Sequence, residues 1–148
     1  MLTPEERAAI EAVVRQYILT HPEIIPQAIS ALQNREVAQL LSARRADLET
    51  PFGSAWAGAA DGDVILVEFY DYGCPFCQQA KADVDRLLAE DKRLKVVYRD
   101  FPVLSDASRE AALASLSAAR QGRHGQFYSA MFGTPGRISH EKVVNGVR

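Results

Sequence analysis

Apolar residues recur at helical spacing through the first third of the chain. Thr3 and Glu6 have the spacing of a capping box, and Pro4 stands at the first helical position, where a missing N–H costs nothing. Residues 20–23 (THPE) interrupt the pattern, which then resumes. Residues 1–48 are therefore predicted to form an arm of two helices. Its apolar positions include Ile10, Val13, Val14, Tyr17, Ile18, Ile25, Ile29, Leu32, Val37, Leu40 and Leu41.

A strand pattern begins at Val64. Residues 64–70 (VILVEFY) are almost continuously apolar, which fits a buried central strand, and residues 94–98 (LKVVY) fit a second one. The helical stretch between them has an expected inner face of Ala80, Val84, Leu87 and Leu88. Two strands that flank a helix of this length form a βαβ unit, so the strands are predicted to be parallel.

The remaining segments complete an α/β pattern. Residues 49–63 are rich in Gly, Ala, Pro and Asp, so they are expected to form a linker or an edge strand. Helices are expected over residues 106–121, 124–132 and 139–147, and residues 133–136 (GTPG) are expected to form a turn. The predicted organisation is thus an arm over 1–48, a connection over 49–63 and an α/β domain over 64–148.

Composition narrows the class of protein. The chain has 148 residues, 47% of them hydrophobic, and a net charge of −2, so nucleic acid is not an expected partner. No apolar run approaches the roughly 18 residues that a membrane span needs. The polar start shows no secretory signal, so the chain is expected either to be cytoplasmic or to lack a signal that its parent has.

The cysteines carry the chemistry. Cys74 and Cys77 are the only two in the chain, so no disulfide framework is available and a four-cysteine zinc site cannot form within one chain. Cys74 falls where the predicted strand passes into a helix, so its sulfur faces unpaired N–H groups that stabilise a thiolate. Pro75 suits the first helical turn. Cys74 is therefore predicted to be the nucleophile and Cys77 the resolving thiol of a dithiol pair.

Glu68 is the charged exception in the first strand, six residues before Cys74. We expect it beneath the active-site helix, where burial would raise its pKa and let it exchange a proton with Cys77. The alternative is that Glu68 points outward at a strand edge.

The run VEFYDYGCPFC at 67–77 resembles the active-site segment of DsbA-like proteins, and residues 98–102 (YRDFP) with the alanine-rich helix that follows are also similar to that family. The resemblance covers roughly residues 52–148 and implies a thioredoxin-like fold with a helical insertion, found mostly in the bacterial periplasm. The arm resembles, more weakly, the helical arm of DsbA-like proteins of the copper-sensitivity-suppressor (ScsC) type. In some of these proteins the arm forms the oligomer.

Two departures from the family bear on activity. Its dipeptide between the cysteines is often Pro-His, whereas Phe76 cannot donate a hydrogen bond to the Cys74 thiolate, so a less oxidising disulfide is expected. The family also has a cis-proline loop facing the cysteines. We expect this chain to end before that loop, because Thr134-Pro135 stands between two predicted helices.

These residues favour a thiol-disulfide oxidoreductase, either a dithiol oxidase or a disulfide isomerase. Its partners would be protein substrates with thiols or disulfides and a redox partner protein, with no cofactor and no bound metal. A periplasmic location is expected, with the cytoplasm as the alternative, and the arm is expected to form a homo-oligomer. Two other functions remain open: a zinc or copper module that uses the cysteine thiolates of two chains, and an oligomerisation module with a vestigial site. Against the metal reading, His124 and His140 are expected to be distant and exposed.

Overall fold

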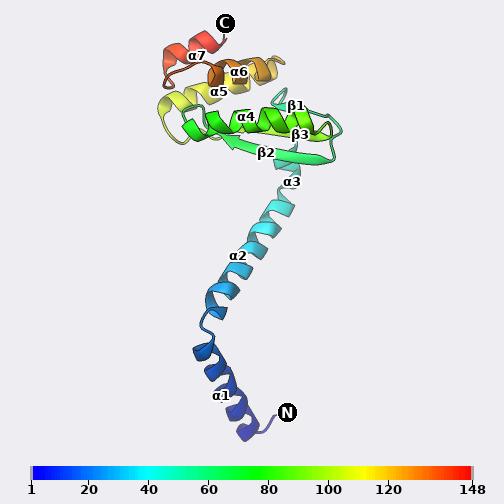
Figure 1. The fold of residues 1–148 in the computed structure, drawn as a ribbon, viewed down its shortest axis with the longest axis vertical. Helices are drawn as coiled ribbons and strands as arrows, with labels where there is room; N and C mark the ends of the chain where they lie inside the picture. The colour runs from blue at the N-terminus through cyan, green and yellow to red at the C-terminus, as the bar shows by residue number, and fades with distance from the viewer. Residues whose placement is uncertain (1, 148) are drawn as a thin grey trace. The chain divides into compact units, whose positions relative to one another are not determined.

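The computed structural model describes residues 2–147 and divides between Arg45 and Ala46 into two compact units. The first contains helices α1 (Pro4–Thr20) and α2 (Ile24–Ala43) (Figure 1). The predicted capping box is confirmed, because the Thr3 N–H donates to Glu6 Oε2 at 2.8 Å and the Glu6 N–H donates to Thr3 Oγ1 at 3.2 Å. The predicted interruption is confirmed as well, since α1 ends at Thr20 and α2 begins at Ile24.

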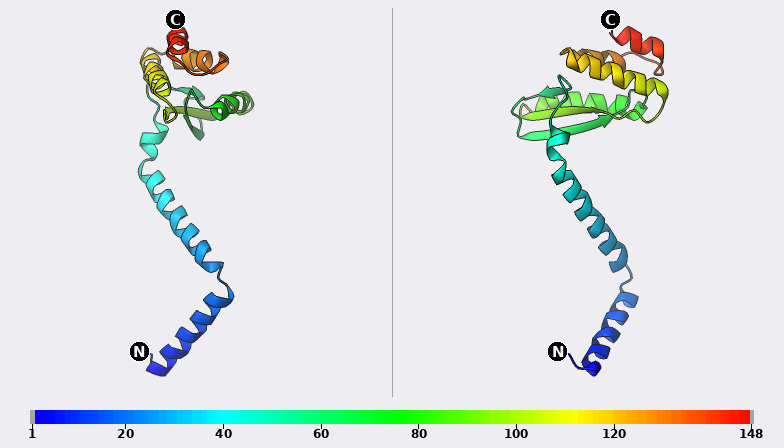
Figure 2. Two further views of the ribbon diagram at one scale, coloured as in Figure 1. Left: turned by 90° about the vertical axis from the view of Figure 1, so that its left-hand side faces the viewer. Right: turned by 180° about the vertical axis from the view of Figure 1, so that it is seen from behind.

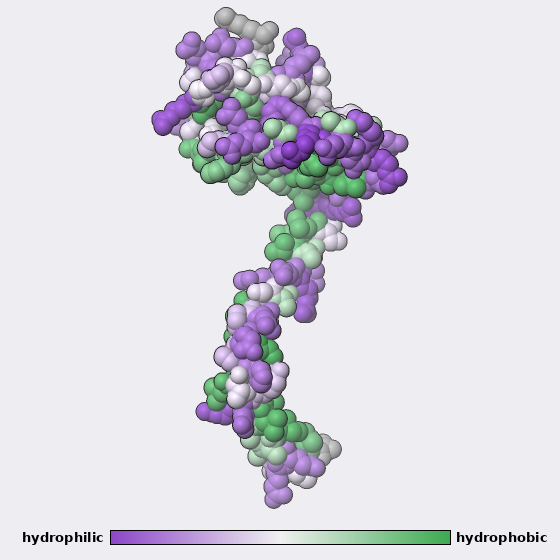
Figure 3. Space-filling model, in the orientation of Figure 1, coloured by the Kyte–Doolittle hydropathy of each residue, from purple (hydrophilic) through white to green (hydrophobic). Residues whose placement is uncertain are grey.

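Both arm helices expose their apolar side chains. Residues 2–45 are all exposed, and neither α1 nor α2 contains a buried residue. Green apolar side chains alternate with purple polar ones along both helices (Figure 3). No helix among residues 2–147 is long and apolar enough to cross a membrane.

The second unit is built on a sheet of three described strands. The short helix α3 (Arg45–Glu49) precedes β1 (Trp56–Gly58), β2 (Val64–Tyr70) and β3 (Leu94–Asp100), and the strand order is β1-β3-β2. Strands β2 and β3 are parallel, as predicted, whereas β1 is antiparallel to β3. The prediction that residues 64–70 form the central strand is wrong for the described sheet, in which β3 is central and β2 lies at an edge. The predicted burial is also wrong for most of this strand, because only Tyr70 is buried and Val64 and Phe69 are exposed. An edge strand has fewer neighbours to cover it, and apolar composition carries no information about strand order.

Four helices complete the unit: α4 (Pro75–Glu90), α5 (Asp106–Arg120), α6 (His124–Gly133) and α7 (His140–Val147). Helices α5, α6 and α7 lie together on one side of the sheet in each view (Figures 1 and 2). The Thr134-Pro135 segment joins α6 to α7 through a trans peptide bond, as expected of a turn. On α4, Val84 is buried but Leu87 is 43% exposed, so the prediction that Leu87 faces inward is wrong. Helical spacing places it at the margin of the inner face, to one side of the buried Val84.

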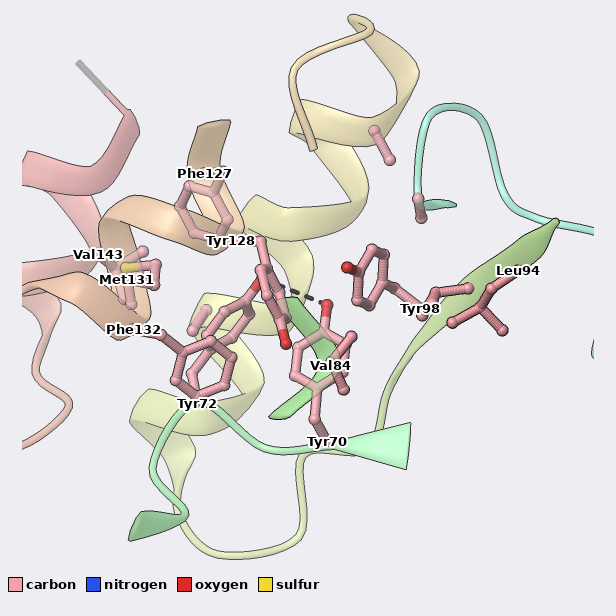
Figure 4. Packing of buried hydrophobic residues seen from close by; sticks show 14 residues of the cluster. Tyr70, Tyr72, Val84, Leu94, Tyr98, Phe127, Tyr128, Met131, Phe132 and Val143 are labelled. Carbon is pink, nitrogen blue, oxygen red and sulfur yellow. Dashed lines mark hydrogen bonds between the residues drawn. The ribbon is translucent and has the colours of Figure 1, made fainter. Parts of the chain in front are cut away.

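One face of the sheet carries the core. Leu94, Val96 and Tyr98 alternate along β3 on the same face, because successive side chains of a strand point to opposite sides. With Tyr70 they join Val84 of α4 and the aromatic side chains of α6 in one buried cluster, where the rings meet mostly edge to face (Figure 4). This packing fixes the end of β2, and therefore the loop after it, against α6.

Candidate active site

Cys74 lies at the N-cap of α4. Its backbone is extended (φ −88°, ψ 118°), Pro75 follows at the first helical position, and the Gln78 N–H donates to the Cys74 carbonyl at 3.1 Å. Proline favours this place because its ring fixes a helical φ and its missing N–H would have had no partner. The sequence thus sets the Cys74 sulfur at the amino end of a 16-residue helix.

The first turn of α4 stabilises negative charge on Cys74. The N–H of Cys77 lowers the pKa of the Cys74 thiol, and the Cys77 thiol and the N–H of Phe76 add to this effect. The two cysteines are not joined by a disulfide in this structure, so the arrangement is that of the dithiol, in which the Cys77 thiol donates toward the Cys74 sulfur. A hydrogen bond to the ionised form favours that form.

Cys77 has the opposite environment. Burial raises the pKa of the Cys77 thiol, and the negative charges of Cys74 and Glu68 raise it further. Its side chain packs against the buried aromatic cluster, one helical turn beyond Cys74. The two thiols therefore have opposite electrostatic environments: that of Cys74 favours the thiolate, and that of Cys77 favours the protonated thiol.

Glu68 lies near the middle of β2, half-buried, on the face of the sheet that carries the core. The Tyr128 hydroxyl of α6 donates to both Glu68 oxygens, at 3.2 and 3.4 Å. Burial raises the pKa of Glu68 and the Tyr128 bond partly offsets this, while the charge of Asp85 raises the pKa and that of Lys81 lowers it. The structure therefore gives Glu68 a protein partner and an electrostatic influence on Cys77.

Exposed aromatic side chains occur between the two cysteines in α4 and at the ends of β2 and β3. Phe76 is 76% exposed, and the rings of Phe69 and Phe101 contact edge to face with centroids 6.2 Å apart, both more than half exposed. Phe76 thus contributes surface but no donor to the Cys74 sulfur from its side chain.

Comparison with known families assigns the second unit. Residues 65–145, more than half of the chain, match the DSBA-like thioredoxin domain. The chain belongs to this DsbA-like family. Residues 6–39 in the arm match a second family, the copper resistance protein ScsC N-terminal domain. The resemblance seen in the sequence is thus confirmed, and so is the expected thioredoxin-like fold.

Individual proteins match this chain over different shares of its length. A thioredoxin-like oxidoreductase from Silicibacter pomeroyi is 39% identical, with a TM-score of 0.61, over 63% of this chain and 54% of its own. Proteus mirabilis ScsC, at 23% identity and a TM-score of 0.69, shares the fold over 98% of this chain and 69% of its own. A segment of a Mycolicibacterium vanbaalenii protein named Na(+)/H(+) antiporter NhaA 1 is 36% identical over 78 residues, which are 51% of this chain and 13% of that protein. The chain thus spans only part of the relatives it matches.

His124 departs most from expectation. It was predicted to be exposed but is completely buried, with Nε2 3.1 Å from the Tyr70 hydroxyl and its ring stacked on Tyr98. Burial lowers the pKa of His124 to about 4. His124 is the first residue of α6 and faces inward with the aromatic residues that follow it. Its polar residue type alone did not indicate this burial. His140 is exposed, as predicted, and contacts Glu110 at 2.5 Å.

Two residues that contact the candidate site were not predicted from the sequence. Tyr128 is one of five tyrosines and has no local signal, because its contact with Glu68 joins elements 60 positions apart. Asp71 is almost fully buried beside Gly73, and an Asp followed two residues later by Gly is a turn signal that could have been recognised. In the described part of the chain, no three His, Cys, Asp or Glu side chains gather in a way that could hold a metal ion.

Proposed function

We propose that this chain exchanges disulfides with protein substrates, with Cys74 as the nucleophile and Cys77 as the resolving thiol. The observation that carries the proposal is the placement of two free thiols one helical turn apart, Cys74 at the N-cap of α4 and Cys77 against the buried cluster. This placement shifts the pKa of Cys74 downward and that of Cys77 upward. Attack on a disulfide needs a thiolate, whereas release of the substrate needs a second thiol that ionises only when required.

Disulfide exchange at this site can reduce or oxidise a substrate. When the dithiol acts, the Cys74 thiolate attacks one sulfur of a substrate disulfide, and the other substrate sulfur leaves as a thiolate that takes up a proton. Cys77 then loses its proton to a base and attacks the mixed disulfide, so the Cys74–Cys77 bond forms and the substrate leaves reduced. In reverse, a substrate thiolate attacks Cys74, Cys77 leaves, and a second substrate thiol displaces Cys74, so the substrate is oxidised.

Glu68 is proposed as the base that receives the Cys77 proton. Burial raises its pKa, which brings its affinity for a proton closer to that of a thiol, and its charge acts on Cys77. A carboxylate with a raised pKa suits proton transfer near neutral pH. Pro75 and Phe76 are proposed to tune the site, Pro75 by fixing the helix start and Phe76 by leaving the thiolate without a side-chain donor.

We favour a dithiol oxidase or a disulfide isomerase over a reductase, since the site combines a stabilised thiolate with an exposed apolar surface that suits unfolded chains. The expected setting is the periplasm, where disulfides form and persist. A redox partner protein would restore the working form.

A direct test uses the two thiols separately. Alkylation of the dithiol should proceed at Cys74 well below pH 8 and more slowly at Cys77. Cys77→Ser should trap a mixed disulfide with an unfolded, disulfide-containing substrate, whereas Cys74→Ser should trap none. Equal alkylation rates at both thiols would contradict these roles. Tight binding of zinc or Cu(I) by the dithiol would instead favour the metal-handling alternative.

The arm carries a second proposed function, homo-oligomerisation. Residues 2–45 expose apolar side chains along both helices without burying one of them. Apolar surface of this extent usually marks an interface. Association through the arm would leave the dithiol unit available to substrates.

A further inference from the structure

Asp71 is a buried carboxylate in the loop between β2 and α4. Its side chain is 5% exposed, and a charge so deeply placed is costly unless several donors reach it. The donors are present. The Gly73 N–H donates to Oδ1 at 2.7 Å, and the Val103 and Leu104 N–H groups donate to Oδ2 at 2.9 and 3.1 Å. The Ser108 hydroxyl is a fourth donor.

These bonds join two segments that are far apart in sequence. One is the turn that carries Cys74, whose N–H donates to the Asp71 carbonyl at 3.0 Å. The other is the connection between β3 and α5. The side chains of Val103 and Leu104 are 64% and 58% exposed, so their own burial contributes little to holding this connection in place.

The turn is also packed closely from the other side. A Cβ on Gly73 would lie 3.0 Å from the Ser108 hydroxyl and 3.1 Å from a methyl carbon of Ile138. A side chain at residue 73 therefore has no room, and the turn that donates to the carboxylate packs directly against Ser108 and Ile138. A fixed negative charge three residues from the nucleophile must oppose a second negative charge there.

We propose that Asp71 is a positioning residue of the dithiol site: its carboxylate ties residues 103–104 to the turn that carries Cys74, and its charge limits the stability of the Cys74 thiolate. The inference rests on the proposed roles of the cysteines and adds a determinant of their reactivity. Its consequences are that the connection containing the exposed residues Val103 and Leu104 is held against the turn that carries Cys74, and that the disulfide is less oxidising than the helix end alone would make it.

The pKa shifts of Asp71 and Cys74 are consistent with both the tie and the effect of the charge. Burial alone would raise the pKa of Asp71, but the bonds from Ser108, Gly73, Leu104 and Val103 outweigh it, so the pKa of Asp71 lies below its ordinary value. The carboxylate is thus ionised at neutral pH. Among the influences on Cys74, the Asp71 charge acts to raise the pKa of the thiol, against the backbone donors.

Two variants distinguish the role of Asp71 as a tie from the role of its charge. Asp71→Asn removes the charge, and its amide cannot accept from all the N–H groups. At the pH where half of wild-type Cys74 is ionised, the thiolate-to-thiol ratio should at least double, and hydrogen exchange at the Val103 and Leu104 amides should accelerate at least tenfold. Ser108→Ala keeps the charge and removes one donor, so exchange should accelerate while the Cys74 titration stays unchanged.

Asp106→Asn is the matched control, because it removes an exposed carboxylate two residues after Leu104 and should change neither readout. An unchanged or raised Cys74 pKa in Asp71→Asn would overturn the charge role, and unchanged exchange in Asp71→Asn and Ser108→Ala would overturn the tie. If Asp71→Asn does not fold, Ser108→Ala still decides the tie. Neither readout requires turnover, so failure here is distinguishable from failure of the proposed exchange reaction.

Discussion

The arm and the thioredoxin-like unit use their apolar residues in opposite ways. In residues 2–45 the isoleucines, leucines and valines are exposed on both helices, and none is buried. In residues 46–147 one cluster buries Tyr70, Val96, Tyr98 and Met131 almost completely. Both stretches have the apolar periodicity of structured protein, yet only the second contains the elements that cover it.

This difference separates two kinds of function. The dithiol needs fixed surroundings, because opposite pKa shifts at Cys74 and Cys77 depend on a packed helix end and on burial beside it. Residues 2–45 contain no cysteine and no buried side chain, and their helices gain little from propensity alone, since most helical stability in proteins comes from packing. A partner surface is therefore the expected source of its stability.

The largest expected effect tests whether the arm acts through association. Leu32→Glu places a charge in the apolar row of α2, and a charge buried at an interface without a partner costs several kcal/mol. The dissociation constant of the oligomer should rise at least about a hundredfold, since 1.4 kcal/mol is a factor of ten. Light scattering measures the mass, and the alkylation rate of Cys74 should not change.

Ala31→Glu is the control for the arm, because it adds the same charge at the neighbouring position on a different side of the helix. A monomeric wild type would remove the oligomer proposal. An oligomer that survives Leu32→Glu and also survives removal of residues 2–45 would place the contact at the edge of β2 instead, where unpaired backbone groups invite association.

The next effect concerns proton transfer in the thioredoxin-like unit. Glu68→Gln keeps the shape of the side chain but removes its capacity to accept a proton from Cys77. Resolution of the mixed disulfide should slow by on the order of 10²-fold, at the lower end of the range for general bases. The first attack by Cys74 should remain nearly unchanged. Stopped-flow fluorescence of both steps measures this, and equal slowing of the two would indicate a general disturbance of the site.

A third effect concerns stability and pH. Burial raises the pKa of Asp100 to about 6 and lowers that of His124 to about 4. The raised acid adds stability as pH falls from about 6 toward 4, because the native state holds a proton that the unfolded state releases. The depressed histidine removes stability between about 6.5 and 4, because only the unfolded state binds its proton. The two contributions nearly cancel in the wild type.

Asp100→Asn should expose the histidine contribution. Relative to the wild type, its free energy of unfolding should fall by about 3 kcal/mol more between pH 6.5 and 4, from roughly two pKa units at 1.36 kcal/mol each. His124→Gln should show the opposite difference. Urea unfolding at several pH values measures both, and parallel pH profiles of wild type and variants would contradict the assignment of these two groups.

Local rules predicted the local features of both regions. Thr3, Pro4 and Glu6 define the start of α1, and the apolar run before Cys74 placed that residue at a helix end, since capping and strand patterns depend on near neighbours. Features set by distant contacts were missed. The edge position of β2, the burial of His124 and the contact of Tyr128 with Glu68 each depend on elements that meet only in the folded chain.

The smallest expected effect tests one of those distant contacts, the hydrogen bond between Tyr128 and Glu68. Tyr128→Phe retains the ring and its packing but removes the hydroxyl that donates to Glu68, a bond that holds the pKa of that carboxyl down. The pKa of Glu68 should rise further. The pH at which resolution reaches half its maximum should therefore move upward, and the rate below that pH should fall by about tenfold or less, as for a typical hydrogen bond with a net worth of about 0.5–1.5 kcal/mol. Tyr72→Phe is the matched control, because its hydroxyl is also buried but bonds to Ser115. An identical pH profile for Tyr128→Phe and Tyr72→Phe would show that Tyr128 fills space without tuning the base.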